Sequence, residues 1–232
     1  MATVILVRHA RSTANTAGVL AGRTPGVELD DAGREQAART GARLGDVPLV
    51  AVVSSPLERC RQTAQAVVDH QGAALTPRLE DDLTECDYGN WQGGALADLA
   101  KEDLWSVVQR QPSAAVFPGG ESLVAMHARA VSAIRRIDAA VEAEHGPAAV
   151  WAAVTHGDLI KAILADALGL HLDLFQRLYA DPASVSVVRY TPSQPHVLAV
   201  NTHAGDLSWL RARPDEPQVG GGAGPAASAT AS

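Results

Sequence analysis

Cysteine, aromatic residues and long hydrophobic runs are all scarce in this chain of 232 residues. Two cysteines cannot form a disulfide framework, so both are expected to be buried free thiols. No apolar stretch is long enough to cross a bilayer, and the N-terminus enters a strand without the pattern of a secretory signal. A formal net charge of -7 and the lack of a basic run argue against nucleic-acid binding. We expect a soluble, cytoplasmic protein with neither a nucleic-acid nor a membrane partner.

The chain also lacks the motifs of several enzyme classes. It contains no Gly-x-x-x-x-Gly-Lys phosphate loop, no Gly-x-Gly-x-x-Gly fingerprint and no His-Glu-x-x-His metal helix. The Gly-x-Ser-x-Gly elbow of serine hydrolases is missing too. Neither Cys60 nor Cys86 is followed by an arginine six positions later, as a cysteine-dependent phosphatase would require. These absences disfavour kinases, dinucleotide enzymes, zinc proteases, serine hydrolases and cysteine phosphatases, and we expect no metal and no cofactor.

Apolar runs of strand length alternate with helical patterns, which predicts an α/β fold. The predicted architecture is a three-layer αβα sandwich with a mostly parallel central sheet and an antiparallel edge strand. Strands are expected near 4–8, 50–54, 74–79, 150–156, 184–190 and 196–201, and helices near 30–44, 57–71, 122–145 and 158–168. Residues 1–211 are predicted to form one domain. Residues 212–232, which are mostly Gly, Ala, Pro and Ser, are predicted to be a disordered tail.

Three of the predicted strands end in residues that suit the binding of an anion. The first delivers Arg8 and His9, with His9 expected at an exposed strand end. The second is followed by Ser55 as an expected helix cap and Pro56 in the first helical position, so that Arg59 points back toward the sheet edge. The strand from 150 onward ends in a histidine and a glycine. Ligands bind outside the carboxyl ends of strands in open α/β sheets, so these side chains are expected to meet there.

Together with a glutamate before an aromatic, glycine-bearing turn at residues 85–93, these segments resemble the histidine phosphatase superfamily, the phosphoglycerate mutase-like proteins. The shared pattern is Arg-His, Ser-Ser-Pro-x-x-Arg-x-x-Gln-Thr-Ala, Glu before Gly-x-Trp-x-Gly, and a late Thr-His-Gly, in that order. The resemblance spans about residues 3–210 and includes 29–37 and 118–122. The segment after the first strand is similar to an actinobacterial-type branch of phosphatases and phosphomutases.

The resemblance implies a role for each matching residue. His9 would be the nucleophile that forms a phosphohistidine, Arg8, Arg59 and His156 would bind the phosphoryl oxygens, and Glu85 would be the proton donor. Further candidate substrate-binding residues are Asn15, Gly157, Arg11, Arg23 and Glu121. It also implies that residues from about 86 to 121 form a substrate-covering insertion, for which a packed surface loop is the alternative.

Elementary electrostatics agrees with these roles. A phosphate monoester is a dianion, and its transition state spreads charge over three oxygens, so fixed cations should surround it. Neighbouring cations should depress the pKa of His9 and keep its attacking nitrogen unprotonated. The pKa of Glu85 should be raised by burial or by the substrate, because an ordinary carboxyl would be ionised at neutral pH.

The sequence departs from the superfamily pattern at two positions. Ala10 stands where glycine is usual, and it would add strain of about 1 kcal/mol if the position needs positive φ or a close phosphate approach. Arg11 stands where many members have glutamate. It either adds positive charge near the site, suited to a second anionic group, or faces solvent.

The function predicted from these observations is a metal-independent phosphomonoesterase that acts through a phosphohistidine on a small phosphorylated metabolite. One alternative is a phosphomutase that returns the phosphoryl group to the substrate. A second alternative is a weakly active phosphate-recognition protein, as Ala10 would suggest. The oligomeric state stays open, with a homodimer as one option.

Overall fold

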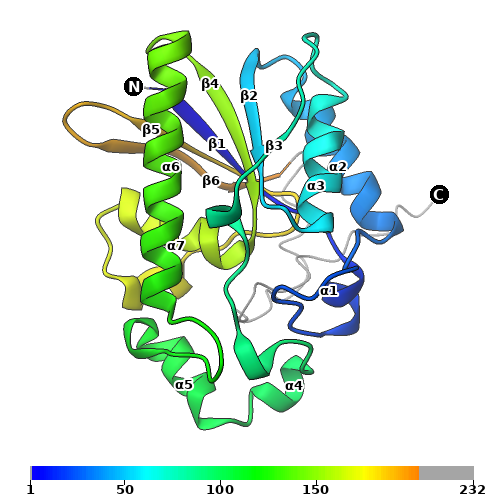
Figure 1. The fold of residues 1–232 in the computed structure, drawn as a ribbon, viewed down its shortest axis with the longest axis vertical. Helices are drawn as coiled ribbons and strands as arrows, with labels where there is room; N and C mark the ends of the chain where they lie inside the picture. The colour runs from blue at the N-terminus through cyan, green and yellow to red at the C-terminus, as the bar shows by residue number, and fades with distance from the viewer. Residues whose placement is uncertain (1, 204–232) are drawn as a thin grey trace.

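The computed structural model describes residues 2–203, which pack around one twisted sheet (Figure 1). The strand order within these residues is β3-β2-β4-β1-β5-β6. Neighbours among the first four strands pair in parallel, whereas β5 is antiparallel to both β1 and β6. The strands are β1 (Thr3–Arg8), β2 (Leu49–Ser54), β3 (Arg78–Leu79), β4 (Val150–Thr155), β5 (Val185–Tyr190) and β6 (Pro195–Thr202).

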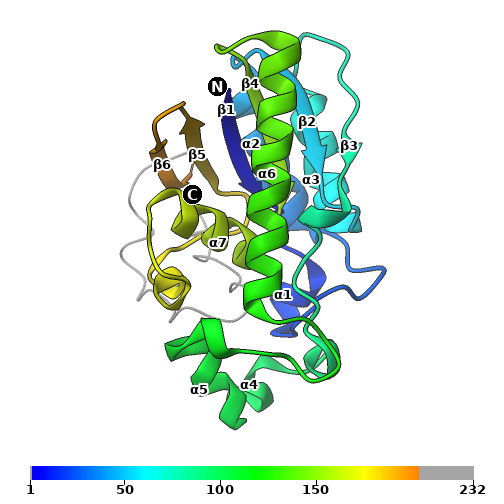
Figure 2. The same cartoon turned by 60° about the vertical axis from the view of Figure 1, so that its left-hand side comes forward.

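Helices cover both faces of the sheet, as Figures 1 and 2 show. One face packs against α2 (Asp31–Leu44) and α3 (Glu58–Val68), and the other against α6 (Leu123–His145) and α7 (Gly157–Ala167). The side chains of β1 alternate accordingly, because successive residues of a strand point to opposite faces. Its residues 4 and 6 join the core on the α6 and α7 side, and residues 5 and 7 join the core on the other side. The predicted three-layer sandwich with a mostly parallel sheet is confirmed.

The predicted helix starts at 30 and 122 are correct because polar caps fix them. The Asp30 carboxylate accepts a hydrogen bond from the amide of residue 33 at the start of α2. The Ser122 hydroxyl accepts one from the amide of residue 125 at the start of α6. The prediction for α3 is wrong in detail. Ser55 and Pro56 both precede the helix, and Leu57 occupies the N-cap position without a side-chain hydrogen bond.

Several other boundaries also differ from the predictions. Helix α3 ends at Val68, and the expected strand at 74–79 is reduced to the two residues of β3. The segment after β1 contains a five-residue helix that the pattern does not predict, α1 (Thr13–Ala17). Short 3-10 helices that were not predicted are η1 (Asp81–Leu83), η2 (Gly89–Trp91), η3 (Pro112–Ala114) and η4 (Leu172–Arg177).

The expected insertion lies beyond the carboxyl ends of the parallel strands, where α4 (Leu96–Leu99) and α5 (Asp103–Arg110) fold (Figures 1 and 2). Its aromatic rings contact one another and belong to the core cluster that also contains residues of β1, β4, α6 and α7. The ring centroids of Tyr88 and Phe117 are 4.9 Å apart, and those of Trp91 and Phe117 are 5.4 Å apart. The segment is therefore a packed part of the core, and its role in covering substrate stays a prediction.

The predicted end of the domain at 211 and the predicted tail at 212–232 lie outside the described residues. Among the helices within 2–203, none has the length and apolar character needed to cross a membrane.

Candidate active site

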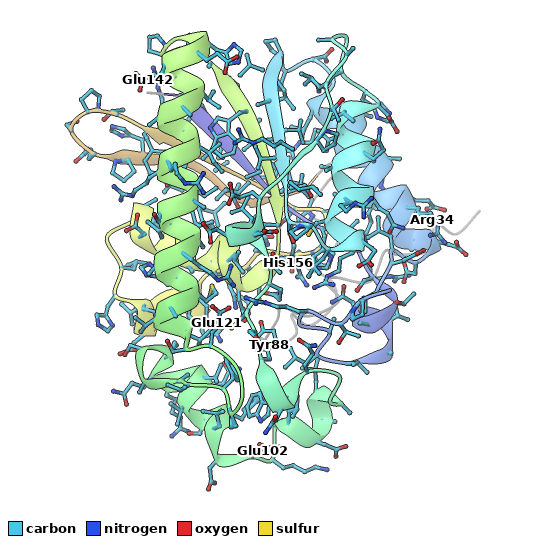
Figure 3. All side chains as sticks on the ribbon, in the orientation of Figure 1. Arg34, Tyr88, Glu102, Glu121, Glu142 and His156 are labelled. Atoms are coloured by element: carbon cyan, nitrogen blue, oxygen red, sulfur yellow. The ribbon has the colours of Figure 1, made fainter. Side chains whose placement is uncertain are left out.

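Five buried polar side chains meet at the carboxyl ends of β1, β2 and β4. Arg8 ends β1, His9 follows it, Arg59 lies in the first turn of α3, and His156 is the N-cap of α7. Glu85 follows η1. The ring centroids of His9 and His156 are 5.2 Å apart, and a Glu85 carboxylate oxygen lies 3.8 Å from Nδ1 of His156. Figure 3 shows His156 in the middle of the molecule, where the strands end.

The protonation state of His9 follows from the hydrogen bond that its ring makes with the backbone. Its Nδ1 lies 2.8 Å from the carbonyl oxygen of Ala10, and because a carbonyl only accepts, Nδ1 carries the proton. Burial lowers the pKa of His9 well below 6.5, and the charges of Arg59 and Arg8 lower it further. The Nε2 lone pair of this neutral ring is therefore free of a proton at neutral pH. The expectation of an exposed His9 is wrong, because only 3% of the residue is accessible.

The ring of His156 is also neutral. Its Nδ1 lies 3.3 Å from Nη2 of Arg59, which only donates, so Nδ1 accepts and Nε2 carries the proton. Nε2 donates to the hydroxyl of Ser55 at 2.9 Å. Burial lowers the pKa of His156 well below 6.5, with the Arg59 charge adding to the effect. Ser55 thus orients this ring instead of capping α3.

Both arginines are almost fully buried. Nη1 of Arg8 donates to the Ala180 carbonyl at 2.8 Å, and Nη2 of Arg59 donates to the Gly22 carbonyl at 2.7 Å. Nη1 of Arg59 is buried without a hydrogen-bond partner among residues 2–203. A buried charged donor without an acceptor is costly, so an anionic oxygen placed against Nη1 would relieve that cost.

Glu85 is poised to exchange a proton near neutral pH. Burial raises its pKa from 4.5 to about 7, the Asp158 charge adds to this rise, and Arg59 opposes it. Its Oε1 accepts a hydrogen bond from the amide of Cys86 at 2.9 Å. The site therefore combines an unprotonated ring nitrogen, two fixed cations and an acid that titrates at working pH. These are the elements of phosphoryl transfer.

Comparison with known proteins decides the family. The residue pattern that defines the histidine phosphatase superfamily (branch 1) matches residues 4–203. The chain belongs to the histidine phosphatase superfamily.

The relatives within this superfamily include several phosphatases. The chain is 29% identical over 212 residues to phosphoserine phosphatase 1 of Hydrogenobacter thermophilus, covering 89% of this chain and 96% of that protein. It is 32% identical over 166 residues to phosphoglycerate mutase-like protein 4 of Arabidopsis thaliana, covering 70% and 69% of the two chains. A solved complex of mycobacterial glucosyl-3-phosphoglycerate phosphatase with VO3 superposes with a TM-score of 0.76 and 27% identity, covering 86% and 98%. The chain is thus a phosphatase of this superfamily.

The departure from the superfamily pattern at Ala10 creates no backbone strain. Among residues 2–203, the non-glycine residues with positive φ are Ala183 and Asn201, so position 10 does not require glycine for its backbone. The Ala10 methyl group packs in a small core cluster with Leu29 and Ala37. The expected cost from positive φ does not apply.

Arg11 is paired with a carboxylate, and the two roles expected for it, a contact with an anionic group of the substrate or a solvent-facing position, stay predictions. Its Nε lies 2.8 Å from a carboxylate oxygen of Asp30, and its side chain is 31% exposed. The ion pair compensates its charge. Asn15 lies in α1, where its Oδ1 accepts from the amide of Ser12 at 3.0 Å in a capping box. Gly157 is buried as the first residue of α7, directly after the site histidine.

Arg23 and Glu121 lie next to Glu85 and are bonded to protein groups. Nη2 of Arg23 lies 3.1 Å from a carboxylate oxygen of Glu121, and its Nε donates to the backbone carbonyl of Glu85 at 2.9 Å. Their predicted contact with substrate stays a prediction, and a different role for Glu121 is argued below.

The sequence pattern does not reveal a second buried network beside the acid. Asp158 accepts a hydrogen bond from the Tyr88 hydroxyl at 2.8 Å and forms an ion pair with Lys161 at 2.8 Å. Lys161 also donates to Gln176 at 2.8 Å. The available signal was an Asp and a Lys three residues apart in a largely apolar helix, where a charged pair inside the protein is unusual. The charge of Asp158 helps to raise the pKa of Glu85.

Both cysteines are buried beside the site. Sγ of Cys60 lies 3.4 Å from Nε2 of His156, and burial raises the pKa of the Cys60 thiol to about 12. Burial raises the pKa of Cys86 as well. Because the thiolate is the reactive form, neither thiol is activated for oxidation.

Proposed function

We propose that this protein is a metal-independent phosphomonoesterase that acts on a small phosphorylated metabolite through a phosphohistidine on His9. The observation that carries this proposal is the neutral His9 ring, whose Nδ1 is bonded to the Ala10 carbonyl while burial and the fixed charges of Arg59 and Arg8 keep Nε2 unprotonated. The buried Nη1 of Arg59, without a partner within residues 2–203, supplies a donor for a phosphoryl oxygen.

In the first step, Nε2 of His9 attacks the phosphorus atom and the bond from phosphorus to the substrate oxygen breaks. Arg8 and Arg59 offset the charge on the phosphoryl oxygens, and Glu85 in its protonated form gives its proton to the leaving oxygen. The products of this step are the free alcohol, an ionised Glu85 and a phosphoryl group on Nε2. The proton on Nδ1 stays in place, held by the Ala10 carbonyl.

In the second step, water attacks the phosphorus atom and the bond to Nε2 breaks. The ionised Glu85 takes one proton from the water, so that inorganic phosphate leaves and the acid is restored. A pKa of about 7 suits both halves of this cycle, because the carboxyl group must donate and then accept at the same pH. Gly157 and Asn15 complete the proposed contacts with the phosphoryl group.

A phosphomutase is the second candidate, and the relative named phosphoglycerate mutase-like protein 4 favours it. In that reaction the same phosphohistidine would transfer its group to a hydroxyl of the substrate instead of water. The third candidate, a weakly active phosphate-recognition protein, depends on Ala10. The backbone there has no positive φ, and the other expected cost, a close approach of the phosphate to the Ala10 methyl group, stays a prediction.

Single-turnover labelling tests the proposal. With a substrate carrying labelled phosphate, we expect a transient protein adduct that is labile in acid and stable in base, as phosphoramidates are. Label that then appears as inorganic phosphate supports the phosphatase, and label on a second hydroxyl supports the mutase. The absence of any adduct during turnover would refute the phosphohistidine.

The absence of a metal requirement is tested separately. Within residues 2–203 no three His, Cys, Asp or Glu side chains are grouped as metal ligands. We expect activity to survive exhaustive chelation, because the arginines supply the positive charge that a metal would otherwise provide. Loss of activity in EDTA with rescue by a divalent ion would overturn this part of the proposal.

A further inference from the structure

Arg129, on the buried side of α6, makes a set of contacts that the proposed reaction does not use. Its Nη1 donates to the backbone carbonyls of Asp82 and Thr84, both at 2.7 Å, and Nη2 donates to the carbonyl of Glu85 at 3.1 Å. Nε and Nη2 also donate to the two carboxylate oxygens of Glu121, at 3.0 and 2.6 Å. A guanidinium has five N–H donors in a fixed plane, so this side chain has a partner for each of them.

Glu121 is bonded as fully as Arg129. Its Oε1 accepts from Nη2 of Arg129, from Nη2 of Arg23 at 3.1 Å and from the backbone amide of Asp87 at 2.8 Å, while Oε2 accepts from Nε of Arg129. Only 17% of each side chain is exposed in this pair. The carboxylate therefore has little capacity left for a substrate, and its contacts all lead to the segment around Glu85.

Two guanidinium groups converge on the backbone of the proposed acid. The carbonyl of Glu85 accepts from Nη2 of Arg129 and from Nε of Arg23, and Arg129 also holds the carbonyls at 82 and 84. The backbone amide of Asp87 donates a hydrogen bond to the Glu121 carboxylate, so charged side chains bind the backbone on both sides of Glu85. In Figure 3, Glu121 and Tyr88 lie below His156, between the strand ends and helices α4 and α5.

Two glycines allow the neighbouring backbones to approach closely enough for this network. A Cβ on Gly89 would lie 2.3 Å from the Pro118 carbonyl oxygen, and one on Gly120 would lie 2.2 Å from the Asp87 carbonyl oxygen. Both distances are far below van der Waals contact. The glycines of the 85–93 and 118–122 motifs thus bring Glu121 against the segment that carries the acid.

We propose that Arg129 and Glu121 are positioning residues that fix the backbone of Glu85, so that its carboxyl group reaches the leaving oxygen beside His9 and His156. The pair acts on the proton donor and not on the phosphoryl group or the rest of the substrate. This inference rests on the proposed function for the role of Glu85. It replaces the substrate-binding role that the sequence predicts for Glu121.

The test uses Arg129→Lys and Glu121→Gln in the full chain, with Arg135→Lys as a matched control. Lysine keeps the charge but has at most three donors, so it cannot hold three carbonyls and a bidentate carboxylate. Arg135 lies on the same helix, where Nη2 contacts Asp166 at 2.7 Å on a half-exposed surface. If Arg129→Lys folds poorly, Glu121→Gln tests the same ion pair from its other side.

The first readout separates the acid step from the rest of the reaction. We expect both variants to lower kcat/KM for an alkyl phosphate by at least about tenfold and kcat/KM for p-nitrophenyl phosphate by less than about threefold, because the nitrophenolate needs little protonation. The ratio kcat/KM is compared because it reports the first step, whereas kcat also contains the attack of water, in which Glu85 acts on every substrate alike. The control should match wild type on both substrates. Equal losses on the two substrates, or no loss on either, would overturn the proposal.

The second readout needs no turnover. Hydrogen exchange of the backbone amides at 82–87 should become faster in Arg129→Lys and stay unchanged in Arg135→Lys. Unchanged exchange in both variants would overturn the positioning role. If labelling of wild type finds no phosphohistidine, the proposed function fails by itself, and the exchange result still decides whether this pair orders the segment.

Discussion

The raised pKa of Glu85 predicts that the proposed acid destabilises the folded protein at and above neutral pH. The pKa of this carboxyl rises from 4.5 to about 7 on folding, mainly because of burial. A raised pKa means that the folded protein binds the proton more tightly than the unfolded chain does. The stabilisation from this proton is therefore complete below pH 4.5 and is lost as the pH rises through about 7.

The size of the effect follows from the same values. The two pKa values differ by about 2.5 pH units, and at about 1.4 kcal/mol per unit the folded state loses about 3 kcal/mol in total. Between pH 5 and pH 8 the expected change is about 2 kcal/mol. Glu85→Gln removes the ionisation. Its free energy of unfolding, relative to wild type, should therefore rise with pH by that amount.

Urea unfolding followed by circular dichroism at intervals from pH 5 to pH 8 measures this difference directly. His9 and His156 have lowered pKa values and give a pH dependence of the opposite sign, but they are present in both proteins and cancel in the difference. Glu35→Gln, the same substitution at an exposed position of α2, is the matched control. Parallel curves for Glu85→Gln and wild type would refute the reasoning.

Four further predictions follow from the site. His9→Asn keeps a donor for the Ala10 carbonyl and removes the nucleophile, so steady-state turnover should be lost, whereas the control His145→Ala should keep it. A rate for His9→Asn within about tenfold of wild type, which is about 1.4 kcal/mol in the barrier, would contradict the mechanism. Glu85→Gln should lower kcat/KM for alkyl phosphates at least about tenfold more than kcat/KM for p-nitrophenyl phosphate, and an unchanged dependence of kcat/KM on leaving-group pKa would exclude Glu85 as the acid. Asp158→Asn removes a charge that raises the pKa of Glu85, so the alkaline limb of the kcat profile for alkyl phosphates should move to lower pH, and an unmoved limb would refute this coupling. Vanadate should inhibit by competing with substrate, and noncompetitive inhibition in initial-rate assays would place its binding elsewhere.

The sequence predicts the layers of the fold well because their signals are local. The apolar run of β1 and the helix caps Asp30 and Ser122 are each signals carried by a few neighbouring residues. The short helices α4 and α5 are missed because four to eight residues carry too little periodicity to define a face.

The site is predicted only in part, for a related physical reason. Motif order indicates which residues carry the chemistry, and the structure brings Arg8, His9, Arg59, Glu85 and His156 together. Their protonation states depend on partners that no motif specifies. Arg129 contacts Glu85 across 44 positions of the chain, and on sequence alone an arginine in a long helix is typical of a solvent-facing surface. The ion pair in which Asp30 compensates the charge of Arg11 also joins residues that no sequence motif links.

The segment between the acid and α6 is closed at its base by backbone hydrogen bonds. The amide of Glu121 donates to the Asp87 carbonyl at 2.9 Å, and the amide of Asn90 donates to the Pro118 carbonyl at 2.8 Å. A chain excursion that begins and ends at the same fixed point can change in length and sequence without moving the residues outside it. Residues 91–117 are therefore held at both ends, but buried Trp91, Leu99, Val108 and Phe117 belong to the main core, so changes of sequence or length are expected to leave the phosphoryl-transfer residues in place only at the exposed positions between them.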